Sequence, residues 1–226
     1  MFDAIVITMG NYTSHIPPPC QEEVLVRFAD DDLLVVEKPA GLLTVPGRFV
    51  KDCVLQRVMF DYPDVVVLHR LDLDTSGLLV MSQSKHATSE LNRQFREREI
   101  SKEYLATVFG EVEKVKGEIG FALRPDPNDR PRQVVDEQEG KPALTRYELL
   151  QIVDGNSELL LMPVTGRSHQ LRIHLASIGH PILGCDLYAH EDAFAAADRL
   201  MLHASRLSFT HPSSGERMSF ASEAPF

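Results

Sequence analysis

Residues 65–81 read VVVLHRLDLDTSGLLVM and place a polar stretch between two apolar runs. Val65–Leu68 and Leu78–Met81 are rich in β-branched and aliphatic residues, which predicts two buried strands. The stretch between them, His69–Gly77, contains Asp, Thr, Ser and Gly, all of which favour turns. The segment therefore predicts a strand, a polar loop and a second strand, with the loop held by a rigid sheet.

The rest of the chain alternates short strand patterns with a few helical ones. A helix is expected from a Ser84 cap to about Arg98, and another over His169–Ile178 with Ser168 as its cap. Residues Arg124–Pro142 have the composition of a loop. Further strands are expected at Val24–Phe28, Leu33–Glu37, Tyr104–Val108, Arg146–Gln151, Glu158–Pro163, Leu202–Phe209 and Met218–Phe220. A turn at Asp154-Gly155-Asn156 is expected to join Arg146–Gln151 to Glu158–Pro163. This order predicts an α+β fold with a mixed, mostly antiparallel sheet and flanking helices.

The length of 226 residues suits one domain. The first 22 residues include the run Pro17-Pro18-Pro19 and are predicted to form a flexible extension, with the compact domain at residues 23–226. Three cysteines without CxxC spacing argue against a disulfide framework and for a reducing compartment. The N-terminus lacks the pattern of an export signal, and no apolar run is long enough for a membrane span, so we expect a cytoplasmic protein.

The charge balance limits how this chain can hold nucleic acid. The formal net charge is −10, which argues against a protein that binds nucleic acid through bulk positive charge. A local basic groove remains open, because phosphates respond to charges within about 10 Å at ordinary ionic strength. Basic residues concentrate in Arg93–Lys102 and in Arg124–Lys141, where a solvated surface and an RNA contact are both left open.

The polar loop His69–Gly77 has two interpretations. It is an ordinary turn, or it is a catalytic loop, since loops on a rigid scaffold often carry functional residues. In the second case Asp72 is the candidate group, because an oriented carboxylate can act as a nucleophile at a sugar carbon.

A second candidate region is Thr165–His174, which reads TGRSHQLRIH. Helix N-termini and arginines both attract anions, so Arg167 and Arg172 predict a phosphate or carboxylate contact, with solvated charges as the alternative. His169 and His174 are five residues apart and share no helix face well, so no metal site is predicted. Tyr104 is either a core aromatic or a residue that stacks on a base.

Together these segments resemble the RluA family of RNA pseudouridine synthases. His69–Leu79 (HRLDLDTSGLL) is similar to the central motif of that family, HRLDxxTSGLL. Glu37–Leu43 (EKPAGLL), Lys102–Ala106 (KEYLA) and Thr165–His174 are similar to its other motifs, in the same order. His180–Tyr188 (HPILGCDLY) is similar to the segment that follows, except that Cys185 stands where the family usually has Gly-Asp directly.

The chain also resembles the short members of the family with dual specificity, which modify uridine 32 of the tRNA anticodon loop and uridine 746 of 23S rRNA. Leu42–Arg48, Arg93–Arg98 and the last six residues carry this similarity. The chain has no room for the S4 RNA-binding domain of larger relatives, so residues 23–226 are expected to form the catalytic domain alone. The resemblance implies an RNA partner, no cofactor and no metal, and we expect a monomer.

The resemblance also implies roles for three catalytic residues. Asp72 matches the essential carboxylate, which attacks C1′ or removes a C2′ proton, and the sequence leaves both routes open. Arg172 matches the arginine that pairs with this carboxylate. Tyr104 matches the tyrosine that packs on the base and assists transfer of the C5 proton.

Four further residues complete the expected substrate side of the site. Leu171 would pack on the other side of the base, and Arg70 matches the arginine that fills the space of the flipped nucleotide. Arg167 is expected to contact phosphate. His69 is placed on the substrate side as well, with a purely structural role as its alternative. Asp74 occupies a variable family position and is assigned no catalysis.

Two other classes of function fit these residues less well than an RNA-modifying isomerase does. A non-catalytic RNA-binding protein would not need the set of Asp72, Tyr104 and Arg172. A glycoside hydrolase would use two carboxylates at a defined separation, and the central motif supplies no convincing second one. The isomerase explains the residues best.

Overall fold

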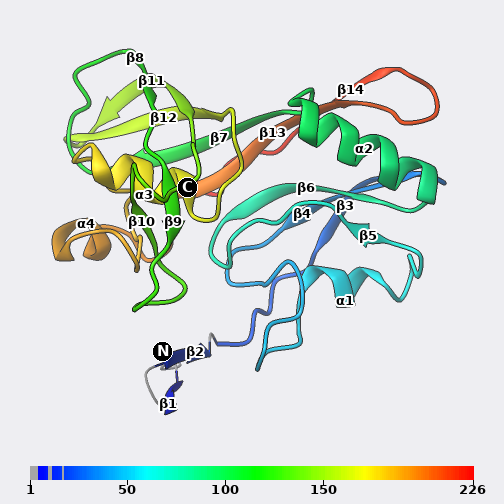
Figure 1. The fold of residues 1–226 in the computed structure, drawn as a ribbon, viewed down its shortest axis with the longest axis horizontal. Helices are drawn as coiled ribbons and strands as arrows, with labels where there is room; N and C mark the ends of the chain where they lie inside the picture. The colour runs from blue at the N-terminus through cyan, green and yellow to red at the C-terminus, as the bar shows by residue number, and fades with distance from the viewer. Residues whose placement is uncertain (1–4, 10–11, 17) are drawn as a thin grey trace. The chain divides into compact units, whose positions relative to one another are not determined.

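The computed structural model describes residues 5–9, 12–16 and 18–226 (Figure 1). These residues fall into two units. The Asp72 unit comprises residues 18–102 and 203–225, and the Arg172 unit comprises residues 103–202 with the described residues before position 17 and Phe226. The chain passes from one unit to the other within strand β7 (Ser101–Val108) and again within strand β13 (Leu202–Thr210).

The Asp72 unit is built on a mixed sheet. Its strands follow the order β3-β4-β6-β13, with β14 beside β13 and β5 beside β6. All these pairs are antiparallel except β6 with β13, which is parallel. The bounds are Leu25–Ala29 for β3, Leu33–Lys38 for β4, Val66–Val67 for β5, Ser76–Ser82 for β6 and Arg217–Ala221 for β14. The predicted fold class is confirmed by this mixed, mostly antiparallel arrangement.

The prediction of a buried strand at Val65–Leu68 is wrong in extent. Only Val66–Val67 pair, with Ser82 and Met81 of β6, and 43% of Val66 is exposed. A β-branched run predicts a strand but does not tell an edge strand from a central one. By contrast, all seven residues of β6 are buried.

Two helices flank this sheet and lie on opposite sides of β4 and β6 in Figure 1: α1 (Val54–Val58) and α2 (Lys85–Glu97). The predicted Ser84 cap of α2 is confirmed, because its Oγ accepts a hydrogen bond from the Ala87 backbone N–H at 3.0 Å. Ala87 and Leu91 pack into a core with Leu33, Val35, Leu78 and Val80. The helix ends at Arg98, which adopts the left-handed conformation.

The Arg172 unit has its own antiparallel strands in the order β7-β12-β11-β8. β8 is Lys116–Ile119, β11 is Thr145–Val153 and β12 is Asn156–Pro163. The predicted turn between the last two strands is confirmed, with Asp154 and Gly155 at φ +51° and +76°. Helix α3 spans Gln170–Ser177 and α4 spans Glu191–Ala195.

The region predicted as a loop, Arg124–Pro142, contains most of a small hairpin. β9 (Leu123–Pro125) and β10 (Gln133–Val135) pair in antiparallel register. Each strand has three residues, which is too few for a periodic pattern to be recognised in a polar stretch.

The predicted Ser168 cap of α3 is wrong. His169 is the N-cap residue, at φ +53°, and its side chain makes no capping hydrogen bond. The buried side chain of Gln170 instead fixes the turn that precedes the helix. Its Oε1 accepts hydrogen bonds from Arg167 N at 3.0 Å and Thr165 Oγ1 at 2.7 Å. The predicted end of the helix is confirmed by Gly179 at φ +88°.

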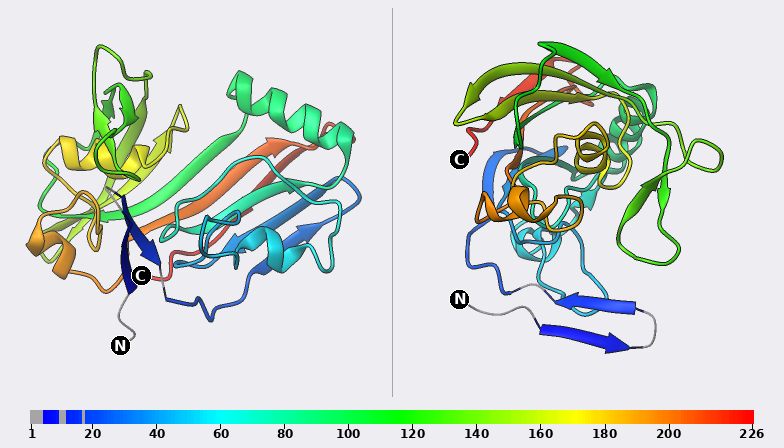
Figure 2. Two further views of the ribbon diagram at one scale, coloured as in Figure 1. Left: turned by 60° about the horizontal axis from the view of Figure 1, so that its bottom comes forward. Right: turned by 90° about the vertical axis from the view of Figure 1, so that its left-hand side faces the viewer.

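Near the N-terminus, β1 (Ile5–Met9) pairs antiparallel with β2 (Tyr12–Ile16), as Figure 2 shows. The sequence did not predict this hairpin. The flexible extension predicted for the first 22 residues stays a prediction, and residues 1–4, 10–11 and 17 lie outside the described part of the chain. None of the described helices has the length and apolar composition needed to span a bilayer.

Candidate active site

The loop that carries Asp72 lies between β5 and β6, and both of its neighbours in sequence are fixed. Thr44 Oγ1 donates to the Leu71 carbonyl at 2.9 Å and accepts from the Leu71 N–H at 3.2 Å. Lys38 Nζ donates to the Leu73 carbonyl at 2.8 Å. The half-buried carboxylate of Asp72 therefore extends from a backbone that is held on both sides.

Lys38 links this loop to the turn after β4. Its side chain is fully buried, and its Nζ also donates to the carbonyls of Pro39 at 2.8 Å and Leu42 at 2.7 Å. One amine thus satisfies three backbone acceptors from two separate segments. Such a group is costly to remove, because buried acceptors lose their donor.

Lys38→Met should lower the free energy of unfolding by about 3 kcal/mol, because three buried carbonyls lose their donor. Lys51→Met is the matched control, since the exposed Lys51 also donates to backbone carbonyls, those of Gly47 and Arg48. The control should change the unfolding free energy by less than about 0.5 kcal/mol. Urea denaturation measures both, and equal losses would contradict a special role for Lys38.

The end of the loop is fixed against β13. Gly77 has φ +112°, and a Cβ at this position would lie 2.6 Å from the Ala204 backbone N, so only glycine fits. Ser76 Oγ lies 2.9 Å from His203 Nδ1, and His203 Nε2 lies 2.9 Å from Ser222 Oγ. The Ser-Gly pair of the motif therefore anchors the loop to the sheet.

His69 is the first residue of the loop, and its side chain packs against Phe95. Its Nε2 accepts a hydrogen bond from the Val80 backbone N–H at 3.2 Å, and its ring lies 4.9 Å from that of Phe95. Burial, together with the smaller effect of the nearby Lys102 charge, lowers the pKa of His69 to about 3. These contacts favour the structural alternative for His69, while its role toward substrate stays a prediction.

This lowered pKa makes stability depend on pH. An unfolded histidine takes up a proton near pH 6.5, whereas folded His69 resists protonation until about pH 3. The contribution of neutral His69 to the free energy of unfolding is therefore complete above pH 6.5 and is lost as the pH falls toward 3. At pH 5 the loss is about 2 kcal/mol. His69→Gln keeps an acceptor for Val80 and does not titrate. Urea denaturation at pH 7 and pH 5 measures the free energy of unfolding, which should fall by about 2 kcal/mol more in the wild type than in His69→Gln. Equal decreases in the two proteins would contradict a lowered pKa for His69.

The other predicted residues lie in the Arg172 unit, apart from Arg70, which is exposed in the Asp72 unit. Tyr104 lies in β7 opposite Leu161 of β12 and is 9% exposed. Leu171 is buried in the first turn of α3. Arg167 is exposed and donates to the Pro142 carbonyl at 3.2 Å.

Arg172 is buried in α3 despite its charge, which contradicts the alternative of a solvated residue. Its Nε and Nη2 each donate to Cys185 Sγ at 3.3 Å, and Nη2 forms an ion pair with Asp186. Its guanidinium carbon lies 5.6 Å from the centre of the Tyr188 ring. These three neighbours of Arg172 were not predicted as site residues, although all lie in the motif-like segment His180–Tyr188.

The two histidines considered as metal ligands make hydrogen bonds within the Arg172 unit. His169 Nδ1 lies 2.8 Å from the Tyr188 hydroxyl, and His174 contacts Thr145 Oγ1 and the Phe121 carbonyl. Burial lowers the pKa of His174. Among the described residues, no three His, Cys, Asp or Glu side chains are grouped as a metal ion would require.

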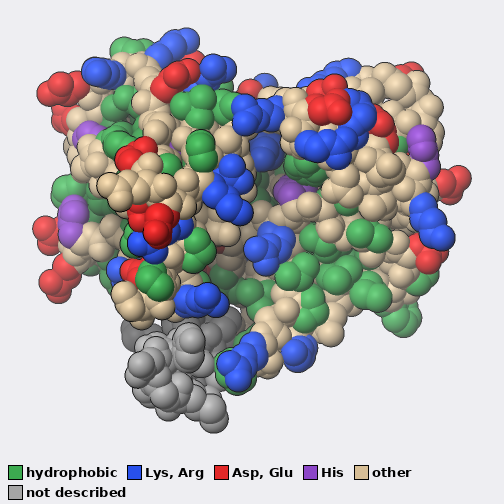
Figure 3. Space-filling model, in the orientation of Figure 1, with side chains coloured by type: hydrophobic (Ala, Val, Ile, Leu, Met, Phe, Trp, Pro, Cys, Tyr) green, Lys and Arg blue, Asp and Glu red, His purple; other side chains and the backbone are tan. Residues whose placement is uncertain are grey.

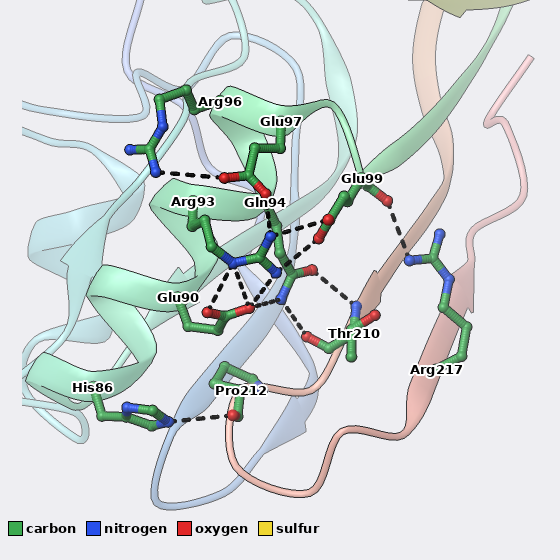
Figure 4. A network of polar contacts seen from close by, with 10 residues as sticks. All are labelled: His86, Glu90, Arg93, Gln94, Arg96, Glu97, Glu99, Thr210, Pro212 and Arg217. Atoms are coloured by element: carbon green, nitrogen blue, oxygen red, sulfur yellow. Dashed lines mark hydrogen bonds and ion pairs between the residues drawn. The ribbon is translucent and has the colours of Figure 1, made fainter.

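The basic cluster on α2 is partly neutralised. Arg93 contacts Glu90, Glu97 and Glu99, and these hydrogen bonds raise its pKa (Figure 4). In Figure 3, acidic and basic side chains adjoin one another over this helix. Arg96 and Arg98 are exposed, and Arg96 Nη2 lies 3.7 Å from Glu97 Oε1. An RNA contact at this helix stays a prediction.

Comparison with known proteins decides the family. Residues 32–177 match the family described as RNA pseudouridylate synthase. The chain belongs to this family. Dual-specificity RNA pseudouridine synthase RluA of Escherichia coli O6:H1 is 46% identical over 221 residues, covering 96% of this chain and 99% of that protein. The protein of the same name from Yersinia pestis is 47% identical over 206 residues, covering 90% of this chain and all of that protein.

Solved structures agree with this family assignment. Human RNA Pseudouridylate Synthase Domain Containing 1 is 28% identical, with a TM-score of 0.77 over 93% of this chain and 87% of that chain. Human RNA Pseudouridylate Synthase Domain Containing 4 is 22% identical, with a TM-score of 0.72 over 89% of this chain and 88% of that chain, and shares the fold. This pseudouridylate synthase therefore isomerises uridine to pseudouridine in RNA.

Proposed function

We propose that this pseudouridine synthase modifies two RNAs, at uridine 32 of the tRNA anticodon loop and at uridine 746 of 23S rRNA. The observation that carries the proposal is the 46% identity to a synthase named for dual specificity, over nearly the full length of both chains. A uridine within a stack cannot be reached, so the nucleotide must flip out, and loop substrates reduce the cost of flipping.

The reaction breaks the bond between C1′ and N1, turns the base and joins C1′ to C5. The C5 hydrogen leaves as a proton and N1 gains one, so no cofactor enters the balance. We assign the carboxylate chemistry to Asp72, which the fixed backbone of its loop supports. Asp72 attacks C1′ as a nucleophile or removes a C2′ proton as a base.

The remaining roles are assigned to residues of known position. Arg172 orients Asp72, and its own buried and hydrogen-bonded guanidinium supports a positioning task. Tyr104 packs on the base and assists the C5 proton, with Leu171 on the other side. The exposed Arg70 fills the space of the flipped nucleotide, and the exposed Arg167 contacts phosphate.

The RNA assignment can be tested with two short RNAs, an anticodon stem-loop and a 23S fragment around position 746. Each is incubated with purified protein and mapped for pseudouridine at single-nucleotide resolution. Matched controls carry cytidine in place of the target uridine. We expect one modified position in each RNA and none in the controls. Modification of one RNA alone, or at another uridine, would contradict dual specificity.

We also propose that the enzyme acts as a cytoplasmic monomer, as its short chain and RNA substrates suggest. Sedimentation at the concentrations used for RNA modification should give the mass of a single 25.3 kDa chain. A dimer under these conditions would contradict this part of the proposal.

A further inference from the structure

Tyr188 lies against Arg172, and the proposed reaction assigns no role to this tyrosine. The guanidinium carbon lies 5.6 Å from the ring centre, within the range of a cation–π contact. Cys185 and Asp186 contact the same guanidinium from the same short segment. We call Cys185, Asp186 and Tyr188 the arginine cradle.

The hydroxyl of Tyr188 is fixed at two further points. It accepts a hydrogen bond from the Gln133 backbone N–H at 2.8 Å, and it lies 2.8 Å from His169 Nδ1. Gln133 begins β10, and His169 is the residue from which α3 starts. The tyrosine therefore connects the hairpin of β9 and β10 with the start of the helix that carries Arg172.

The ring and the hydroxyl of Tyr188 have different functions. The ring supports the guanidinium, and the hydroxyl holds the ring in place through the Gln133 backbone N–H and the His169 side chain. Because Arg172 is only 3% exposed, its contacts with neighbouring side chains decide where its guanidinium points. Its orientation therefore depends on the cradle as well as on the helix.

We propose that Tyr188 is a positioning residue for Arg172, through its ring face and through its hydroxyl bonds with His169 and Gln133. This inference rests on the proposed catalytic role of Arg172. It predicts that loss of the tyrosine impairs the chemical step rather than RNA binding.

The test is single-turnover conversion of the anticodon stem-loop at increasing protein concentration, which separates the saturating rate from the half-saturating concentration. Tyr188→Leu should lower the saturating rate about tenfold, because a desolvated cation–π contact is lost. The half-saturating concentration should change less than about twofold. Tyr188→Phe keeps the ring and loses the two hydroxyl bonds, so its rate should fall by about threefold.

Tyr147→Leu is the matched control, because Tyr147 is a buried tyrosine of the same unit that lies in β11, opposite Gly117 of β8 and Leu161 of β12. It should reduce the melting temperature and leave the saturating rate of the folded protein unchanged. All rates are measured well below the melting temperatures determined by circular dichroism.

A double-mutant cycle separates positioning from general stability. In the Arg172→Met background, Tyr188→Leu and Tyr188→Phe should lower the saturating rate no further, because the group that they position is absent. A wild-type saturating rate in Tyr188→Leu, or equal losses in both backgrounds, would overturn the inference about Tyr188. In that case a slow Arg172→Met variant would still support the proposed role of Arg172. A wild-type rate in Arg172→Met would overturn the proposed role of Arg172 and the inference about Tyr188 together.

Discussion

Asp72→Asn should lower the single-turnover rate of pseudouridine formation by about 10⁴-fold or more, the scale expected when an essential nucleophile or base is lost. The amide is nearly isosteric with the carboxylate but can neither attack C1′ nor accept a proton. Lys38 and Thr44 hold the backbone on both sides of position 72, so the loop should keep its conformation. RNA affinity should therefore change little.

Asp74→Asn is the matched control for this variant. Asp74 is half-buried in the same loop, and the same change removes one carboxylate. We expect its saturating rate to remain within about tenfold of the wild type, since a residue outside the reaction loses no transition-state contact. A large loss in Asp74→Asn together with an active Asp72→Asn would reverse the assignment of the two carboxylates.

Arg172→Met should lower the saturating rate by about 10²-fold, because Asp72 loses the guanidinium proposed to orient it. Arg172→Lys keeps the charge but loses the planar fork that donates to Cys185 and Asp186. Its rate should lie between those of the wild type and the Met variant. Single-turnover rates at saturating protein concentration measure this order.

Arg167→Met provides the comparison for Arg172. Arg167 is exposed and is proposed to contact phosphate, so its loss should raise the half-saturating concentration and leave the saturating rate unchanged. If Arg172→Met behaves in the same way, Arg172 serves RNA binding alone. That result would contradict its proposed role in orienting Asp72.

The elements predicted correctly are those whose signals are local. The apolar run of β6, the Ser84 cap of α2 and the Asp-Gly turn before β12 are each defined by neighbouring residues. The helices α1 and α4 were not predicted, because five residues are too few to show a helical period. The cap of α3 was predicted wrongly: the N-cap residue is His169 in the left-handed conformation, and the buried Gln170 that follows it bonds to Leu144 and Thr145, which are distant in sequence.

In the candidate site, too, local features were predicted from the sequence and contacts between distant segments were not. The central motif supplied Asp72 as the candidate carboxylate and placed a glycine at position 77, and the structure shows that only glycine fits there. The support of the loop by Lys38, Thr44 and His203 joins segments that are distant in sequence, so a single sequence carries no direct signal for it. The arginine cradle lay within a recognised segment, but its contacts with Arg172 required the packed structure.

The most direct test of the central claim follows the C5 hydrogen and the modified base in one reaction. An anticodon stem-loop with tritium at C5 of its uridines is incubated with wild-type protein and with Asp72→Asn, and tritium release is measured together with mapped pseudouridine. We predict one released hydrogen for each pseudouridine at uridine 32 in the wild type, and neither product in the variant. Pseudouridine formation by Asp72→Asn at a rate close to that of the wild type would contradict the account.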